Sequence, residues 1–463
     1  MSADIKFGTD GWRAVIGAEF TYDSLRRVAD AAGRVFSEDN PGGLIIVGYD
    51  TRFEAGSFAA AAAEVLATHG LRVRLSDSYL PTPALCWSVA TEDEAVGGVM
   101  LTASHNPSEY LGFKLRMADG GASPVAFTAR VEEALWTDPP TARGEYETVN
   151  LVGPYLDTLR SKVDAKAIKA AGLRVIVDPL YGAGQNYLAT ILREFGMEVV
   201  EIHGTRNPGF GGLHPEPIPP WTDDAATAVR DGGFDAAFVT DGDADRIGAI
   251  DSLGRFISPH KIIALVVRHL VEDKKLTGKV VKTVSTSVIV DRLTERLGLE
   301  TITTPVGFKW IYEEMVKGGV LLGGEESGGI GIPSHVRERD GLLMALMLAE
   351  MMAQRSATLG GLVEQLFALT GPMEYSRLDL RLTPEVMADF LARSPQFAQT
   401  ELAGIEVHEI SRLDGVKFFL ADDAWLLMRT SGTEPLVRIY AEAPSAGVVD
   451  DLLAAGRALV EGP

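Results

Sequence analysis

Four short polar loops carry the side chains whose types and spacing fit chemistry. In the first, "TASHNP", Ser104 and His105 stand side by side after the apolar run Val99–Leu101, which predicts a buried strand. A hydrolase nucleophile elbow needs Gly-x-Ser-x-Gly, and Thr102 occupies its first Gly position. The serine is therefore expected to do something other than acyl transfer.

The second loop, "DGDADR", places Asp241, Asp243 and Asp245 at alternate positions after a predicted strand. Three carboxylates so close repel one another unless a cation lies among them, and hard oxygen ligands suit Mg²⁺ or Ca²⁺. An EF-hand is excluded, because Arg246 and Ser252 stand where that loop needs Gly and Glu. The alternative is a solvated acidic turn, but the loop's place after an apolar strand favours a metal.

The remaining two loops fit a phosphosugar. "RTSGTEP" offers Arg429 with the hydroxyls of Ser431 and Thr433 around Gly432, a composition suited to holding phosphate. "GEESGG" offers a carboxylate and a hydroxyl of the kind that bind sugar hydroxyls. Taken singly, each loop is equally compatible with an ordinary polar turn.

Other candidates gain meaning only from these loops. Arg13, Lys114, Lys309 and His335, taken singly, fit solvated surface residues. No Walker A stretch occurs, so nothing indicates a nucleotide site. A serine after a strand, carboxylates for Mg²⁺ and groups for sugar and phosphate together predict phosphoryl transfer between a protein serine and a phosphosugar.

Composition limits the range of functions. The 463 residues carry 43 basic and 64 acidic side chains, a net charge of −21, which argues against binding to nucleic acid or an anionic membrane surface. The longest apolar stretch, after Gly341, is too short to span a bilayer. With a single cysteine and no leader-like N-terminal segment, the expectation is a cytoplasmic protein without disulfides.

Apolar strand patterns alternate with helical patterns in three successive rounds, which predicts an α/β fold with parallel sheets covered by helices. The tail alternates apolar and charged residues and predicts an α+β domain. The expected domains are 1–150, 151–255, 256–370 and 371–463. Because ligands bind at the carboxyl ends of such strands, the loops are expected to face one central cleft.

With "FGTDGWR" in front, the motifs "TASHNP", "DGDADR", "GEESGG" and "RTSGTEP" resemble the phosphohexomutase superfamily, the phosphoglucomutase/phosphomannomutase family, over nearly the whole chain. The resemblance implies four domains around a cleft and a phosphoserine at Ser104. The phosphate on Ser104 and the carboxylates of Asp241, Asp243 and Asp245 would ligate Mg²⁺.

The resemblance also implies roles for the neighbouring residues. Lys114 matches the proposed general base, His105 would lie beside the transfer site, and Arg13 and Arg246 would steady the phosphoserine. Glucose 1-phosphate would pass through glucose 1,6-bisphosphate, which also serves as activator, to glucose 6-phosphate. The implied substrate-binding residues are Glu325, Ser327, Lys309, His335, Arg429, Ser431, Gly432 and Thr433.

The motifs are most similar to those of phosphoglucomutases, because Glu326 follows Glu325 where mannose and glucosamine enzymes usually carry Met or Gln. The start "FGTDGWR" is closer to the glucosamine type, so a phosphomannomutase, a phosphoglucosamine mutase or a dual-specificity enzyme stays open. So do a sugar-phosphate-binding protein without catalysis and a phosphatase. A monomer or a homodimer is expected.

Overall fold

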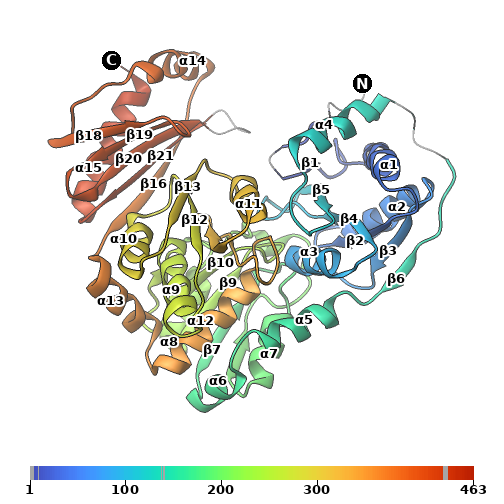
Figure 1. Ribbon diagram of the computed structural model, residues 1–463, viewed down its shortest axis with the longest axis horizontal. Helices are drawn as coiled ribbons and strands as arrows, with labels where there is room; N and C mark the ends of the chain where they lie inside the picture. Colours follow the sequence, from blue (N-terminus) through green and yellow to red (C-terminus); the bar gives the residue numbers. More distant parts are fainter. Residues whose placement is uncertain (1–4, 9, 137, 139–140, 431–435, 463) are drawn as a thin grey trace.

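A computed structural model describes residues 5–8, 10–136, 138, 141–430 and 436–462, and four β-sheets organise them. The chain follows an arc, with the first unit and the C-terminal unit at its two ends (Figure 1). Three units combine sheets with covering helices and the fourth is built on an antiparallel sheet, which confirms the expected fold class. No helix of the described chain is long and apolar enough to cross a membrane.

The first sheet has the order β1-β5-β4-β2-β3-β6. Strands β4, β2, β3 and β6 are parallel, β5 is antiparallel to β4, and β1 is antiparallel to β5. Helix α1 begins after Thr21, whose side chain and that of Ser24 form a capping box. The strands are β1 (Trp12–Val15), β2 (Leu44–Tyr49), β3 (Arg72–Ser76), β4 (Ala95–Leu101), β5 (Tyr110–Met117) and β6 (Glu147–Val149), and the helices are α1 (Tyr22–Asp39), α2 (Ala55–Ala67), α3 (Thr82–Thr91) and α4 (Val125–Glu133).

The second sheet has the order β11-β10-β9-β7-β8, with β9, β7 and β8 parallel and β10 antiparallel to β9. All five residues of β9 are buried, as expected of a strand covered on both faces. The strands are β7 (Arg174–Asp178), β8 (Glu198–Glu201), β9 (Ala236–Thr240), β10 (Ile247–Asp251) and β11 (Phe256–Ile257), and the helices are α5 (Val152–Ser161), α6 (Ala165–Ala171), α7 (Tyr187–Glu194) and α8 (Asp223–Gly232).

The third sheet, β13-β12-β14-β15, is parallel except for β15. Its helix α12 is buried nearly all round, and one apolar cluster runs through it from the second sheet to the third. The strands are β12 (Lys279–Thr283), β13 (Thr301–Thr304), β14 (Val320–Gly324) and β15 (Ile330–Gly331), and the helices are α9 (Pro259–Glu272), α10 (Val288–Leu297), α11 (Phe308–Lys317), α12 (Gly341–Arg355) and α13 (Leu359–Thr370).

The fourth sheet, β16-β21-β20-β19-β18-β17, is antiparallel, and α15 packs against β16 and β21. It has its own apolar core. The strands are β16 (Glu374–Arg381), β17 (Glu401–Leu402), β18 (Ile405–Ser411), β19 (Val416–Leu420), β20 (Trp425–Thr430) and β21 (Leu436–Ala443), and the helices are α14 (Pro384–Arg393) and α15 (Ala446–Glu461).

The functional loops share one structural position. "TASHNP" joins β4 to β5, "DGDADR" joins β9 to β10, and "GEESGG" joins β14 to β15. In each case a parallel strand turns directly into an antiparallel neighbour, so these loops are strand–strand connections and not strand–helix turns. Strand alternation alone did not reveal this, because a short β-hairpin and a βα turn have similar polar compositions.

Candidate active site

Ser104 lies at the first of these connections and is 1% exposed. Its φ is +53°, a left-handed conformation that is uncommon for serine, and its N–H donates to Thr102 Oγ1 at 2.9 Å. The loop of the second unit packs directly against it: a Cβ on Gly242 would lie 2.3 Å from the Ser104 carbonyl oxygen. Only glycine permits this approach, which brings two loops of distant sequence together.

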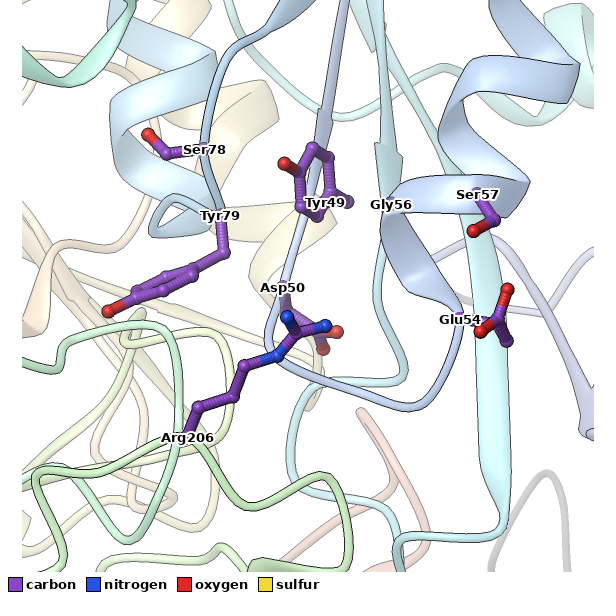
Figure 2. A pocket seen from close by; sticks show the side chains of 8 residues that line it. All are labelled: Tyr49, Asp50, Glu54, Gly56, Ser57, Ser78, Tyr79 and Arg206. Carbon is purple, nitrogen blue, oxygen red and sulfur yellow. The ribbon is translucent and has the colours of Figure 1, made fainter.

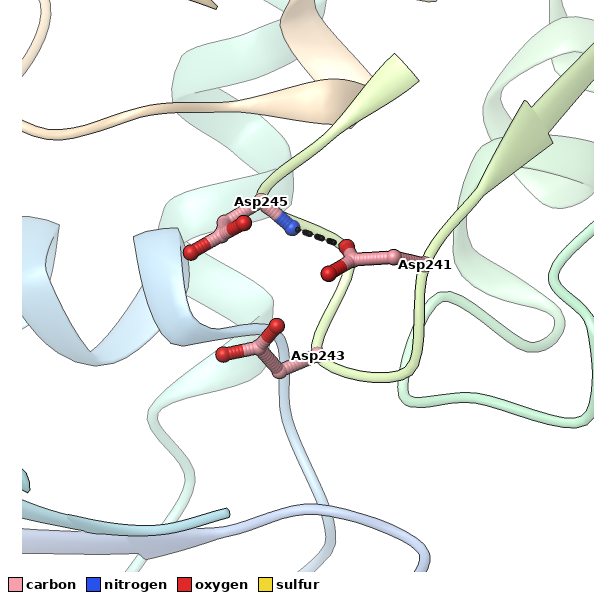
Figure 3. A group of neighbouring side chains, drawn as sticks. All are labelled: Asp241, Asp243 and Asp245. Atoms are coloured by element: carbon pink, nitrogen blue, oxygen red, sulfur yellow. Dashed lines mark hydrogen bonds between the residues drawn. The ribbon is translucent and has the colours of Figure 1, made fainter. Parts of the chain in front are cut away.

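Asp241, Asp243 and Asp245 converge on one point (Figure 3), with one oxygen of each lying within 4.8 Å of the others. All three side chains are buried. The backbone N–H groups of Asp245 and Arg246 donate to Asp241 Oδ1 at 3.0 and 3.1 Å, which shapes the turn. Ser104 Oγ donates to Asp241 Oδ2 at 3.0 Å, so the serine and the acidic group form one site.

The acidic group fits a divalent cation. Burial, followed by repulsion from its two neighbours, raises the pKa of Asp241 well above its usual value. Burial raises the pKa of Asp245 to about 6. The Oδ1 atoms of Asp243 and Asp245 are buried without a hydrogen-bond partner among the described residues. Carboxylate oxygens that lack hydrogen-bond partners are suitable ligands for Mg²⁺. The ion would reduce the repulsion between the carboxylates and would bind the oxygens that have no partner.

Basic side chains already balance part of this negative charge. Lys114 Nζ, on β5, lies 2.9 Å from Asp243 Oδ2 and 2.9 Å from Asp10 Oδ2. Burial alone would lower the pKa of Lys114, but the nearby carboxylates outweigh it and raise that pKa. Arg339 Nη2 lies 2.7 Å from Asp245 Oδ2. Lys114 is thus held as an ammonium beside the acidic group.

Asp10 and Arg339 belong to the site although the sequence did not single them out. Asp10 contacts Lys114, Arg116 at 2.8 Å and Arg339 at 3.4 Å, so it joins strand β5 to the third unit. Asp10 lies in the motif "FGTDGWR", and Arg339 lies in the stretch "HVRERDG". The available signal was a charged side chain in each motif that would need a partner of opposite charge if it were buried. The sequence alone does not give the distance between such partners.

His105, Arg13 and Arg246 surround the serine loop. His105 Nδ1 lies 3.5 Å from Ser104 Oγ, and burial, followed by the charges of Arg246 and Arg13, holds the pKa of His105 well below its usual value. The imidazole is therefore neutral. Arg13 Nη1 donates to Asn106 Oδ1 at 2.6 Å. Arg246 Nε lies 4.0 Å from Asp241 Oδ2 and has no hydrogen-bond partner among the described residues.

The "GEESGG" loop packs against "DGDADR", because Arg246 and Gly329 form an antiparallel bridge. Glu325 is buried, its Oε2 lies 3.7 Å from Arg339 Nη1, and burial raises its pKa to about 7. Ser327 is half-buried in the same turn. Arg339 contacts both Glu325 and Asp245, so the sugar-binding candidate and the acidic group belong to one network.

His335 and Lys309 differ in their surroundings. His335 Nε2 lies 3.0 Å from Asp340 Oδ2, and the Tyr155 hydroxyl donates to the same carboxylate. His335 Nδ1 is buried without a hydrogen-bond partner among the described residues, so it is available to contact a ligand. Lys309 Nζ lies 4.7 Å from the Trp310 ring centroid and takes no part in the described ion-pair network.

Arg429 is the last but one residue of β20 on the fourth sheet and is apart from this network. Its Nε donates to Asp414 Oδ2 at 3.0 Å, and the same oxygen accepts the Val306 N–H at 2.9 Å. Asp414 therefore connects the fourth unit to the third. Ser431, Gly432 and Thr433, predicted to complete the phosphate site, lie outside the described residues.

Comparisons with known proteins agree with this architecture. Profiles of the phosphoglucomutase/phosphomannomutase α/β/α domains I, II and III match residues 4–141, 153–254 and 258–369, and that of the C-terminal domain matches 392–458. A phosphoglucomutase/phosphomannomutase of Thermococcus kodakarensis is 32% identical, and the alignment covers 98% of each chain.

Two further comparisons extend this result. A phosphoglucosamine/phosphogalactosamine mutase of Sulfurisphaera tokodaii is 29% identical over 98% of this chain and 99% of its own. A crystal structure from Thermus thermophilus, whose phosphomannomutase assignment is provisional, is 40% identical with a TM-score of 0.90 over the full length of both chains. The chain thus belongs to the phosphoglucomutase/phosphomannomutase family of phosphohexomutases.

Proposed function

We propose that this phosphohexomutase interconverts glucose 1-phosphate and glucose 6-phosphate through a phosphoserine at Ser104 and a glucose 1,6-bisphosphate intermediate. The observation that carries the proposal is the hydrogen bond from Ser104 Oγ to Asp241, inside a buried group of three aspartates. A serine in this setting is suited to carry phosphate, because a cation at the aspartates would balance the added charge.

In this proposal Asp241, Asp243 and Asp245, with the phosphate on Ser104, hold Mg²⁺. The ion would neutralise charge that develops on the transferred phosphoryl group. Arg13 and Arg246 supply fixed positive charge on the other side of the serine loop. The neutral His105 ring excludes water from the same side and adds no charge of its own.

Lys114 is the candidate general base by family resemblance. Its ion pairs with Asp10 and Asp243 favour the protonated form, so the ammonium also contributes to balancing phosphoryl charge before any proton transfer. Both roles need the same position, beside the acidic group and within the site of transfer.

The substrate would lie between these loops and the fourth unit. Glu325 and Ser327 bind sugar hydroxyls, His335 contacts the substrate through Nδ1, and Lys309 adds a cation. Arg429, with Ser431, Gly432 and Thr433, grips the phosphate that does not react. The bisphosphate then turns over, so that either phosphate occupies the same grip.

The preference for glucose rests on Glu326 and is part of the proposal. Glu326 Oε2 accepts hydrogen bonds from Ser285 Oγ at 2.7 Å and Thr283 Oγ1 at 3.2 Å, so it fixes the shape of the sugar loop. The alternative is a phosphomannomutase, a phosphoglucosamine mutase or a dual-specificity enzyme, which the names of the similar proteins favour equally.

The test is turnover of glucose, mannose and glucosamine 1-phosphates by the full chain with Mg²⁺ and a trace of the matching 1,6-bisphosphate. Conversion of the glucose ester at least ten times faster than the others is the expected result. Equal or faster conversion of another ester would keep the mutase and reject the glucose preference. Steady release of inorganic phosphate would indicate a phosphatase instead, and no conversion of any ester would favour a binding protein.

A further inference from the structure

Arg52, which the proposed chemistry does not use, is a fully buried arginine beneath the serine loop. It follows β2 in the stretch "GYDTR" and is 0% exposed. Burying a guanidinium is costly unless each of its N–H groups finds an acceptor. Its partners therefore indicate what the residue is for.

The Arg52 guanidinium is surrounded by carbonyl oxygens of the loop that carries Ser104. Its Nε donates to Asp50 Oδ2 at 3.1 Å. Its Nη atoms donate to the main-chain oxygens of Ser104 (2.7 Å), Asn106 (2.6 Å), Pro107 (2.7 Å) and Tyr110 (3.0 Å). One planar, five-donor group thus holds four carbonyls of one short loop in a fixed relation.

Asp50 extends the same arrangement to the other side of the serine. Its Oδ2 accepts the Thr102 hydroxyl at 2.6 Å, and Thr102 Oγ1 in turn accepts the Ser104 N–H at 2.9 Å. The Ser104 residue is therefore held at its N–H through Asp50 and Thr102, and at its carbonyl by Arg52 directly. Asp50 also borders a cavity of about 320 Å³, whose walls include Tyr49, Tyr79 and Arg206 (Figure 2).

The second unit closes over the arginine. The Arg52 guanidinium carbon lies 4.8 Å from the Phe210 ring centroid, a cation–π contact made from the loop that follows β8. Thr51 Oγ1 donates to the Tyr181 carbonyl oxygen at 2.9 Å. The support of the serine loop therefore includes side chains and main chain from the unit that supplies the three aspartates.

We propose that Arg52 is a positioning residue that holds Ser104 in its left-handed conformation and directs Oγ toward Asp241. This inference rests on the proposed role of Ser104 as the phosphate carrier. A positive φ at a non-glycine residue is strained and persists only where the surroundings enforce it. The hydrogen bonds to the Ser104 carbonyl and N–H, at the two ends of the strained residue, are those surroundings.

The test compares Arg52→Lys with the native chain and with Arg74→Lys. Lysine keeps the charge but lacks the planar fork, so it cannot hold the four carbonyls together. Arg74 is a matched control, because it lies in the same unit and forms surface ion pairs with Glu92 and Glu147 away from the loop. For Arg52→Lys we expect kcat to fall about 100-fold with KM changed less than threefold, since a displacement near 1 Å has that effect. Arg74→Lys should match the native chain.

The second readout is phosphorylation of Ser104 itself, followed by intact mass after mixing with glucose 1,6-bisphosphate. The rate should fall in Arg52→Lys as far as kcat falls. In Arg52→Ala, guanidinium ion at millimolar concentration should restore part of that rate, because it can occupy the space that the side chain leaves. A purely structural role would instead lower the folded fraction, leave the rate per folded molecule unchanged and allow no rescue, which would overturn the proposal.

Phe210→Leu covers the case in which both Arg52 variants fail to fold. This substitution removes the ring and leaves the hydrogen bonds of Arg52 intact. We expect the rate of Ser104 phosphorylation to fall three- to tenfold, with unfolding like that of the native chain. An unchanged rate of phosphorylation would overturn the proposal. Failure of the native chain to accept phosphate on Ser104 would reject the proposed function, whereas a phosphorylated native chain with an equally fast Arg52→Lys would reject the role of Arg52 alone.

Discussion

The serine region between the first two units and the region around Arg429 in the fourth unit, where we propose that the distal phosphate binds, are built in contrasting ways. Ser104 is enclosed by buried contacts from Asp241, Thr102 and Arg52, which come from three separate loops. Arg429 Nε donates to Asp414 Oδ2, which also accepts the Val306 N–H. The proposed reacting group is thus preorganised by contacts around its own loop, whereas Arg429 lies at a contact between two units that also includes Arg292–Asp423 and Lys417–Val284.

This difference suits the proposed reaction. One phosphate reacts at the serine, while the fourth unit binds, releases and binds again the phosphate that does not react. Fixed geometry lowers the barrier at the serine, because little reorganisation remains for the reaction step. The variants below test whether the two regions separate in kinetics as they do in structure.

The largest effect is expected for Ser104→Ala. Removal of the phosphate carrier should lower kcat by roughly 10⁴-fold or more, as loss of a nucleophile does elsewhere. The measurement is sugar-phosphate turnover with bisphosphate present, with sugar-phosphate affinity by calorimetry as the control, because binding should be nearly unchanged. Turnover within tenfold of the native rate would contradict the mechanism.

Asp241→Asn should separate activity from stability. Repulsion within the acidic group opposes folding, so removing one charge should raise the free energy of unfolding in EDTA by about 0.5–2 kcal/mol while abolishing turnover. Chemical denaturation with and without Mg²⁺ measures both parts. Added Mg²⁺ should stabilise the native chain and leave the variant unchanged; an equal response of the two chains would argue against this metal site.

Asp414→Ala should affect the other region. Loss of the shared oxygen frees Arg429 and removes one of the contacts between the third and fourth units, so KM for the sugar phosphate should rise about five- to tenfold, which corresponds to about 1–1.4 kcal/mol. We expect kcat to change less than twofold. Asp423→Ala is the matched control, because Asp423 also joins the two units, through Arg292, without contacting Arg429. A fall in kcat with constant KM would contradict the separation of the two regions.

The smallest effect concerns Lys417, at the contact between the third and fourth units. Its Nζ donates to the Val284 carbonyl oxygen at 2.7 Å. Burial, followed by repulsion from Lys282, lowers the pKa of Lys417 to about 7, although the carboxylates of Glu442 and Asp291 act to raise it. Because folding lowers the pKa of Lys417, the unfolded chain binds more protons than the folded chain above pH 7. The free energy of unfolding should therefore increase as the pH rises above 7. The Trp425 ring centroid lies 3.8 Å from Nζ and favours the ammonium form. We therefore expect the free energy of unfolding to rise by only about 1 kcal/mol between pH 7 and pH 9.

The check is urea denaturation of the native chain and Lys417→Met at pH 6, 7, 8 and 9. The difference between the two chains should favour methionine most at low pH and shrink as the pH rises. A constant difference would show that Lys417 stays charged in the folded protein.

Much of the fold could be predicted from the sequence. The apolar runs before Ser104 and Asp241 are strands, as predicted, and strands alternate with helices through the first three units. Apolar periodicity records burial directly, so these elements follow from local pattern. The shared core around α12 was not predicted, because an all-apolar helix does not reveal which sheets it separates.

The site was predicted in part. Motif chemistry identified Ser104 and the aspartates, which the structure brings into contact. It did not identify Arg52, Asp10 or Arg339, because a charged residue in a motif is as often solvated as buried, and its partners lie in other units of the chain. Lys309 is the converse case, a predicted residue that lies outside the described ion-pair network.

The sequence by itself determined the residue types, the order of the strands and the loops that follow them, since these depend on neighbours along the chain. Only the tertiary structure decided that the loops join parallel to antiparallel strands, that Gly242 admits the Ser104 carbonyl, and that Arg52 holds the serine loop. These features depend on distances between segments that lie far apart in sequence. Burial then determines which charges need partners, because the cost of an unpaired charge appears only once water is excluded.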